Sequence, residues 1–285
     1  MDVLVIALGL GSALLLAVGF AVQQRTAEQM PRSHRLEPRL LLDLVHRPVW
    51  LAGIAAMVGG QLLGAAALGH GELTLVEPLM ASNVLFALPL AAAWHKRRLG
   101  RREWLGAIVL IAGLAVFVLA ADPGASRRTL VPAALWVEAL VPIFLVVSGF
   151  VALGRRHPDP ARQATLLAAG AGTLYGLQDA LTQRTLQLGF TLTMLETWQP
   201  YLLVAVAVVG LLLAQSAYQT APLSASQPAM AIAEPITGIA LGAGLLAQGL
   251  RLGPLPLAFE LVGIAGMVTG LLLCAGSPVV AARAV

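Results

Sequence analysis

Apolar runs of about twenty residues recur along this 285-residue chain, and their length limits what it can fold into. Twenty helical residues rise about 30 Å, the thickness of the hydrocarbon core of a bilayer. Charged residues make up only 11% of the chain, whereas soluble domains carry about 25%. A soluble fold would lack polar surface, so the sequence predicts an all-α protein that crosses a membrane several times.

The runs predict nine spans within one polytopic membrane domain, residues 1–285. The predicted spans are Val3–Val22, Val49–Leu68, Leu73–Ala93, Trp104–Ala121, Leu130–Leu153, Ala164–Arg184, Trp198–Tyr218, Ser224–Leu246 and Leu257–Ala275.

The basic residues between the spans predict the orientation. With the N-terminus outside, the cytoplasmic segments hold 14 of the 18 lysines and arginines, and the opposite side holds 4. Cytoplasmic loops of membrane proteins carry such an excess of positive charge. We therefore predict a multi-pass protein of the cell membrane, with its N-terminus outside and its C-terminus in the cytoplasm.

An internal repeat predicts how the spans are related. A shift of 150 residues aligns Leu73, Pro78, Met80 and Ala81 with Leu223, Pro228, Met230 and Ala231. Shifts of 159 and 157 align Gln24-Arg25-Thr26 with Gln183-Arg184-Thr185, and Glu103, Gly106, Gly113 and Leu114 with Glu260, Gly263, Gly270 and Leu271. The first four spans (about 3–121) thus recur as the last four (about 164–275) around a central fifth span (about 130–153). Each span of the second copy comes five spans after its equivalent in the first. Because five is an odd number, the second copy is inverted in the membrane, as in many secondary transporters.

The same segments resemble a known group of membrane proteins. The 4 + 1 + 4 layout and the Glu77-Pro78-Leu79-Met80-Ala81 sequence are similar to the drug/metabolite transporter superfamily. Within it, His46-Arg47-Pro48-Val49-Trp50 resembles the NIPA-like and EamA-like branch. NIPA-like proteins are named for magnesium transport in some members, so the resemblance implies a transporter.

Acidic residues inside the predicted spans are the first candidates for a substrate site. An ionisable group in the bilayer is costly, so it faces a protein interior or a cavity. Asp179 shares a helix face with Tyr175, and Glu234 lies closest to the middle of its span. We predict that Asp179 and Glu234 bind a proton or cation. The alternative is that both are buried carboxyls bonded to neighbouring helices.

Other polar residues and three prolines complete the predicted site. The substrate or ion path is expected to include Glu77, Gln61, Tyr175, Gln215, Tyr218 and Gln227. Helix breaks are expected at Pro78, Pro228 and Pro235, because proline removes a backbone hydrogen bond. Alternatively, the amides only hold helices together. The pattern specifies no metal site.

These features predict a secondary transporter or facilitator that moves a small solute by alternating access. One alternative is a magnesium-type divalent-cation transporter, and another is a membrane scaffold or accessory subunit without transport. No nucleotide-binding or metalloprotease motif is present, so we expect no enzyme activity and no cofactor. The expected partners are the lipid bilayer and a small-molecule or cation substrate; a homodimer is left open, and no nucleic acid is expected.

Reporter fusions test the predicted orientation. Fusions after Arg102 and Arg162 should report the cytoplasm, and fusions after Asp122 and Arg251 should report the outside. An external signal after Arg102 would contradict both the orientation and the inverted repeat.

Overall fold

The computed structural model describes residues 3–70, 76, 79–80, 82–94, 96, 98–121, 132–187, 195–245 and 253–275. Every regular element in these ranges is helical, which confirms the all-α prediction for the described part of the chain. The helices are α1 (Val3–Ala27), a 3-10 turn η1 (Arg32–His34), α2 (Pro38–Val45), α3 (Pro48–His70), α5 (Asn83–Trp94), α6 (Arg101–Ala121), α7 (Ala133–Arg156), α8 (Pro160–Gln187), α9 (Gln199–Thr220), α10 (Leu223–Gly244) and α11 (Pro254–Ala275).

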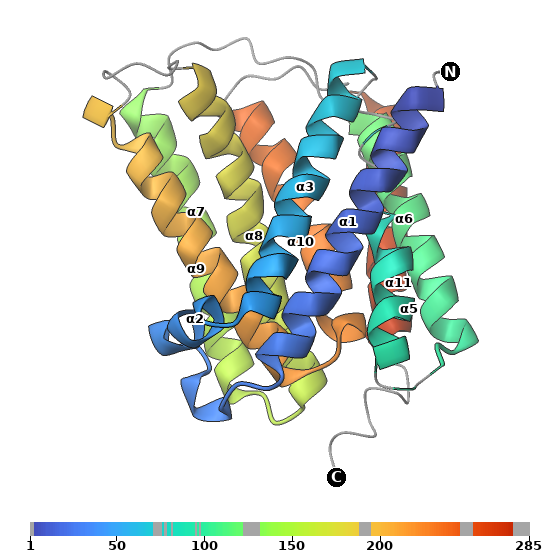
Figure 1. Ribbon diagram of the computed structural model, residues 1–285. Coiled ribbons are helices and arrows are strands. Elements are labelled where there is room, and N and C mark those ends of the chain that lie inside the picture. Colours follow the sequence, from blue (N-terminus) through green and yellow to red (C-terminus); the bar gives the residue numbers. More distant parts are fainter. Residues whose placement is uncertain are drawn as a thin grey trace.

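The long helices form a bundle in which neighbours along the chain run in opposite directions (Figure 1). In the first half α1 packs against α3 and α5, and in the second half α8 packs against α9 and α10. Helices α6 and α11 form a third extensive contact, and α10 touches both α11 and α5. The start of α1 and the end of α11 lie at opposite ends of the bundle.

Within the part of the chain that the structure describes, six helices are long and apolar enough to cross a membrane: α1, α3, α6, α7, α9 and α11. The other three predicted spans coincide with α5, α8 and α10. Helix α5 is apolar but has only 12 described residues. Helices α8 and α10 are long enough but less apolar: α8 contains several charged and amide residues, and α10 contains Glu234 and two prolines. The nine-span arrangement therefore stays a prediction.

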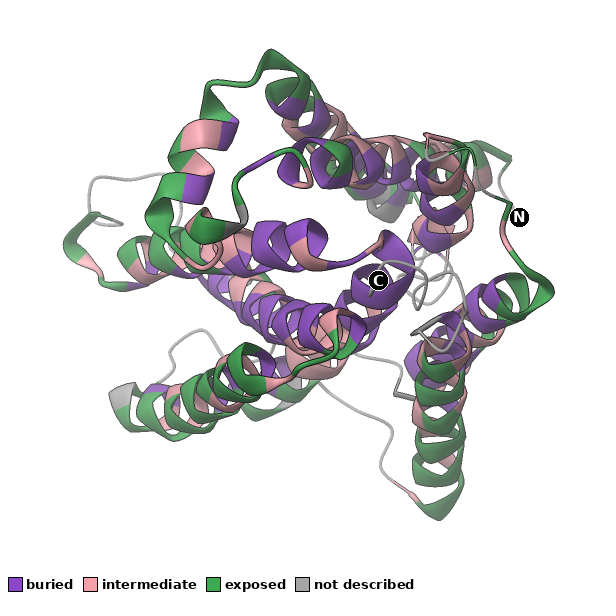
Figure 2. Cartoon of the chain, turned by 90° about the horizontal axis from the view of Figure 1, so that it is seen from below, coloured by how far each residue is buried: buried purple, intermediate pink, exposed green. Residues whose placement is uncertain are grey.

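Helices α8 and α10 are also the most enclosed. Figure 2 shows buried residues gathered on central helices and exposed residues on outer ones. Most of the first half of α10 is buried, whereas the apolar α7 is largely exposed. A helix shielded from lipid by its neighbours does not need to be apolar on every side. Hydropathy alone therefore does not identify α8 and α10 as membrane spans.

The sequence analysis assigned no helix to the segment between the first two spans, but α2 lies there. Pro38 begins it, and proline suits a first helical position. Leu40 and Leu44 are fully buried, while Leu42 is 61% exposed. Helix α2 packs against α3 and α9, so it covers one end of the bundle.

The predicted breaks in α10 are not seen. The helix is continuous from Leu223 to Gly244 with Pro228 and Pro235 inside it. Each proline still removes the hydrogen bond that its N–H would give to the carbonyl four residues earlier, in Ser224 and Ala231. A helix packed on several sides is held by its neighbours, so losing single bonds does not interrupt it. Pro78, the third predicted break, lies outside the described residues.

Glycines bring α6 and α11 into direct backbone contact. A Cβ on Gly106 would lie 2.8 Å from the carbonyl oxygen of Gly270, and one on Gly113 would lie 2.7 Å from that of Gly263. The sequence repeat equates Gly106 with Gly263 and Gly113 with Gly270. Each repeat-related pair therefore exchanges partners across the contact, as residues do about a two-fold axis.

Substituting Gly113 tests this contact. In Gly113→Ala the new methyl group would meet the Met267 amide nitrogen at 2.6 Å, and overpacking of this kind costs roughly 1–3 kcal/mol. The free energy of unfolding, measured in bilayers or mixed micelles, should fall by about that amount. Gly149→Ala on α7 is the control, since nothing lies within 4 Å of its Cβ position. Equal stability of the two variants would contradict the contact.

Candidate functional site

The two predicted carboxylates lie on α8 and α10, which pack against each other. Gly172 and Gly176 of α8 face the α10 backbone, and a Cβ on Gly172 would lie 2.8 Å from the Met230 carbonyl oxygen. Asp179 Oδ2 lies 4.0 Å from the Cβ position of Gly238, one helical turn beyond Glu234. The close approach of the two backbones therefore puts both acids at one junction. Asp179 is exposed and Glu234 is half-buried.

Two tyrosines surround Glu234. Tyr175 on α8 is half-buried and Tyr218 on α9 is fully buried. Both lie close enough to Glu234 to interact with it electrostatically. The Tyr218 hydroxyl donates to Gln227 Oε1 at 3.4 Å and approaches Met230 Sδ at 3.9 Å. The structure thus groups a carboxylate with two phenol hydroxyls.

A network of amides lies beside this group. Gln215 Nε2 donates to Gln23 Oε1, and Gln23 Nε2 donates to Met57 Sδ, which links α9 to α1 and α3. Gln227 Nε2 donates to Asn83 Oδ1 at 3.4 Å, which links α10 to α5. We call Gln23, Asn83, Gln215, Tyr218 and Gln227 the amide network.

Gln23, Gln215, Tyr218 and Gln227 lie toward the lower end of the bundle in Figure 1, where α1 and α9 end and α10 begins, whereas Asn83 begins α5, which runs down to that end. Further bonds close the same end. Gln219 Nε2 donates to the Met30 and Pro31 carbonyls at 3.0 and 2.8 Å, and the Leu36 N–H donates to Ser216 Oγ at 3.1 Å. Arg35 Nη1 donates to Gln163 Oε1 at 2.6 Å. The segment between α1 and α3 is thereby tied to α8 and α9.

The predicted site residues are thus divided by position. Tyr175, Asp179 and Glu234 lie at the α8–α10 junction, and Gln215, Tyr218 and Gln227 lie in the amide network. Gln61 is exposed on α3, whose extensive packing is with α1. Glu77 lies outside the described residues. The functional roles of these residues stay predictions.

Several polar residues that are buried or hydrogen-bonded in the structure were not predicted as site residues. Gln23 fell just beyond the first predicted span, which ended at Val22, although α1 continues to Ala27. Asn83, like Gln61, is an amide residue in a mainly apolar stretch of the sequence. Glu103 is fully buried, and its Oε2 accepts from the Gly100 N–H at 2.8 Å. That pattern is a helix N-terminal capping contact. Arg184, the last residue of the predicted span Ala164–Arg184, is only 6% exposed on α8.

A double-mutant cycle tests the amide network. Gln23→Leu and Gln215→Leu each remove the bond between α1 and α9, so the two losses of unfolding free energy should not add. Interhelical hydrogen bonds in membranes couple by about 0.6 kcal/mol on average and up to about 1.7. We expect a coupling in that range for Gln23 with Gln215. Gln61→Leu with Gln215→Leu is the control and should be additive; additivity of the first pair would contradict the bond.

The chain is similar in sequence to known proteins. Over 247 residues the chain is 29% identical to an uncharacterized protein of Corynebacterium glutamicum, covering 85% of this chain and 84% of that protein. Over 125 residues it is 26% identical to a probable magnesium transporter of Candida albicans, covering 44% and 34% respectively. No solved structure matches the chain.

Residues 2–153 match the family described as Magnesium transporter NIPA. The matched segment spans α1 to most of α7, and so contains Gln23, Gln61 and Asn83. NIPA is a transporter family of the drug/metabolite type and is not enzymatic. Because the match covers more than half of the chain, this multi-pass membrane protein belongs to the NIPA magnesium transporter family.

Proposed function

We propose that this protein carries Mg²⁺ across the membrane by alternating access, with Asp179 and Glu234 as the residues that attract the ion. One observation carries the proposal: Asp179 and Glu234 lie on two helices, α8 and α10, whose backbones are in close contact. Acids in membrane-spanning helices are rare and mark ion pathways. Membership of the NIPA family and the similarity to a probable magnesium transporter support Mg²⁺ as the ion.

The ligand chemistry suits a hydrated ion. Mg²⁺ loses its water reluctantly and is held in proteins by one or two carboxylates plus several waters. Within the described residues no three His, Cys, Asp or Glu side chains gather into a metal cluster. Two carboxylates, with Tyr175 and Tyr218 nearby, provide hydrogen-bond acceptors for the water shell of the ion.

The packing supports alternating access. We propose that the chain has nine spans in two inverted repeats. The exchanged glycine pairs between α6 and α11, and the matching contacts of α1 with α3 and α5 and of α8 with α9 and α10, support this arrangement. The acids are more exposed than the amide network, in which Gln23, Gln215, Tyr218 and Gln227 are at most 3% exposed. The ion would thus enter from the acid side while the amide network closes the other.

A second candidate is a proton-coupled transporter of a small organic solute. The observation that favours it is the placement of Glu234 beside Tyr175 and Tyr218, because a half-buried carboxyl next to hydroxyl groups suits proton exchange. The two functions share the fold and the acids, so experiment must separate them.

Glu234→Gln separates them. The amide is nearly isosteric, so the fold should be kept. If Mg²⁺ is carried, uptake into proteoliposomes should need about tenfold more Mg²⁺ for half-saturation, equivalent to about 1.4 kcal/mol. Excess Mg²⁺ should restore most of the rate, with little change in its dependence on pH. If protons drive solute uptake, the variant should instead lose the dependence on pH.

Asp179→Asn is a parallel test of the second acid, and Glu138→Gln is the matched control. Asp179→Asn should resemble Glu234→Gln, whereas Glu138 is exposed on α7 and its substitution should leave uptake unchanged. Absence of Mg²⁺ uptake by the unmodified protein, at normal inserted yield, would contradict the proposal. A wild-type Mg²⁺ dependence in both acid variants would remove these residues from the pathway.

A further inference from the structure

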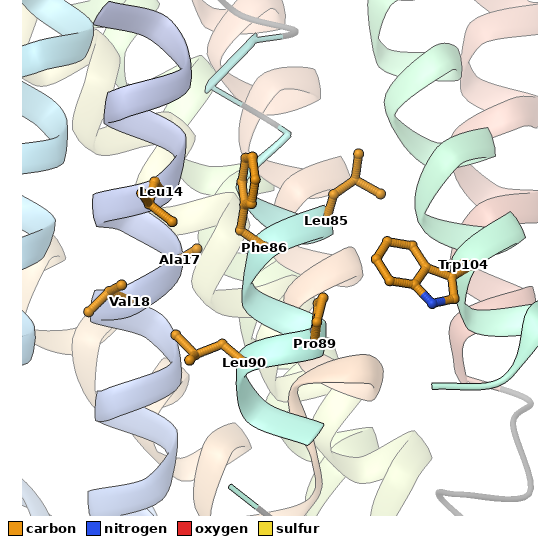
Figure 3. A pocket seen from close by; sticks show the side chains of 8 residues that line it. All are labelled: Leu14, Ala17, Val18, Leu85, Phe86, Pro89, Leu90 and Trp104. Atoms are coloured by element: carbon orange, nitrogen blue, oxygen red, sulfur yellow. The ribbon is translucent and has the colours of Figure 1, made fainter. Parts of the chain in front are cut away.

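An apolar cavity of about 590 Å³ lies between α1, α5 and α6, apart from the acids and the amide network. Figure 3 shows Leu14, Ala17 and Val18 on α1 facing Phe86, Leu90 and their neighbours on α5, with Trp104 on α6 at the far side. Its lining is Leu14, Ala17, Val18, Leu85, Phe86, Pro89, Leu90 and Trp104. No charged side chain contributes to it, so it suits a hydrocarbon occupant.

The cavity is open to the surroundings of the protein. Leu14 is 50% exposed, Phe86 38% and Trp104 41%. These residues belong to helices that we place in the bilayer, so the open side of the cavity meets lipid tails. An apolar groove of this size in contact with lipid can accept an acyl chain.

Cations lie at the end of the cavity nearest the water. Arg25 follows Val18 by seven residues, so it lies on the same face of α1. Its guanidinium carbon lies 5.4 Å from the ring centroid of Trp94, which is one turn beyond Leu90 on α5. On α6, Arg101 precedes Trp104 by one turn. Arg25 and Arg101 thus extend two of the three cavity walls toward the lower end of the bundle (Figure 1).

Other charges nearby are mostly positive. Lys96 and Arg98 are exposed on the segment that joins α5 to α6, and Arg102 is exposed in the first turn of α6. Of the nearby acids, Glu103 is fully buried and its carboxylate accepts from the Gly100 N–H. Glu28 accepts from Gln24 on the last turn of α1. Among the described residues, the exposed cations around the mouth therefore outnumber the acids.

We infer that this site binds one anionic phospholipid, with an acyl chain in the α1–α5–α6 cavity and its phosphate headgroup at Arg25 and Arg101. Basic pockets between membrane helices bind anionic headgroups, and each basic residue near the surface contributes about 1 kcal/mol. The apolar cavity alone would accept any lipid tail. The cations at its mouth make the site selective for a negatively charged lipid. The inference does not depend on which ion or solute the protein carries.

Quenching of Trp104 fluorescence by lipids with brominated acyl chains tests the site. The protein is reconstituted in phosphatidylcholine with a minor fraction of brominated phosphatidylglycerol or brominated phosphatidylcholine. The Trp104 signal is the difference from Trp104→Phe. We expect phosphatidylglycerol to quench it at least about fivefold more effectively than phosphatidylcholine, the factor given by 1 kcal/mol.

Two pairs of variants test the two parts of the site. Arg25→Gln with Arg101→Gln should abolish the preference for phosphatidylglycerol. Arg155→Gln with Arg156→Gln, an exposed basic pair at the end of α7, should keep it. Val18→Phe narrows the cavity and should reduce quenching by both lipids, whereas Val146→Phe on the exposed face of α7 should not.

Three outcomes would overturn the inference. The first is equal quenching by the two lipids in the unmodified protein. The second is a preference that survives loss of Arg25 and Arg101, and the third is quenching that Val18→Phe leaves unchanged. Native mass spectrometry of the unmodified protein is independent of the variants, and retention of phosphatidylcholine as readily as phosphatidylglycerol would also count against the site.

Discussion

The bilayer interior offers no water to a polar group, and the rest of this structure depends on that constraint. A polar side chain in a membrane helix must find a partner inside the protein or line a hydrated space. The chain meets the constraint by placing its more polar helices, α8 and α10, among others and its apolar helix α7 at the periphery. The half-buried Glu234 and the amide network are then kept within the bundle.

Close backbone contact makes this arrangement possible. Without a hydrophobic effect between helices, packing in the membrane relies on small residues that let backbones approach. Gly172 and Gly176 do so between α8 and α10, and Gly106 and Gly113 do so between α6 and α11. The first contact brings Asp179 to the α10 helix that carries Glu234. The second joins the two halves of the chain through equivalent residues.

The sequence predicted the helices well because apolar length is a local property. It also identified Tyr218 and Gln227, which contact each other, and Asp179 and Glu234, which share a junction. It could not predict that Gln215 pairs with Gln23, because that bond depends on how α9 packs against α1. It predicted breaks at Pro228 and Pro235, because local chemistry takes no account of neighbouring helices. It missed α2, whose short amphipathic pattern is unlike a membrane span.

The composition of the amide network matters for a transporter, because a closed end must also open. Interhelical hydrogen bonds in membranes are worth about 0.6 kcal/mol each. The network bonds Gln23–Gln215 and Gln227–Asn83, with the neighbouring Gln219–Met30 bond, therefore amount to about 2 kcal/mol. Conformations that exchange during function differ by a few kcal/mol, which matches this sum. Buried ion pairs at the same positions would cost several kcal/mol to separate. Uncharged amides can therefore hold the lower end closed and still release it, while Asp179 and Glu234, the residues proposed to attract the ion, lie farther along α8 and α10.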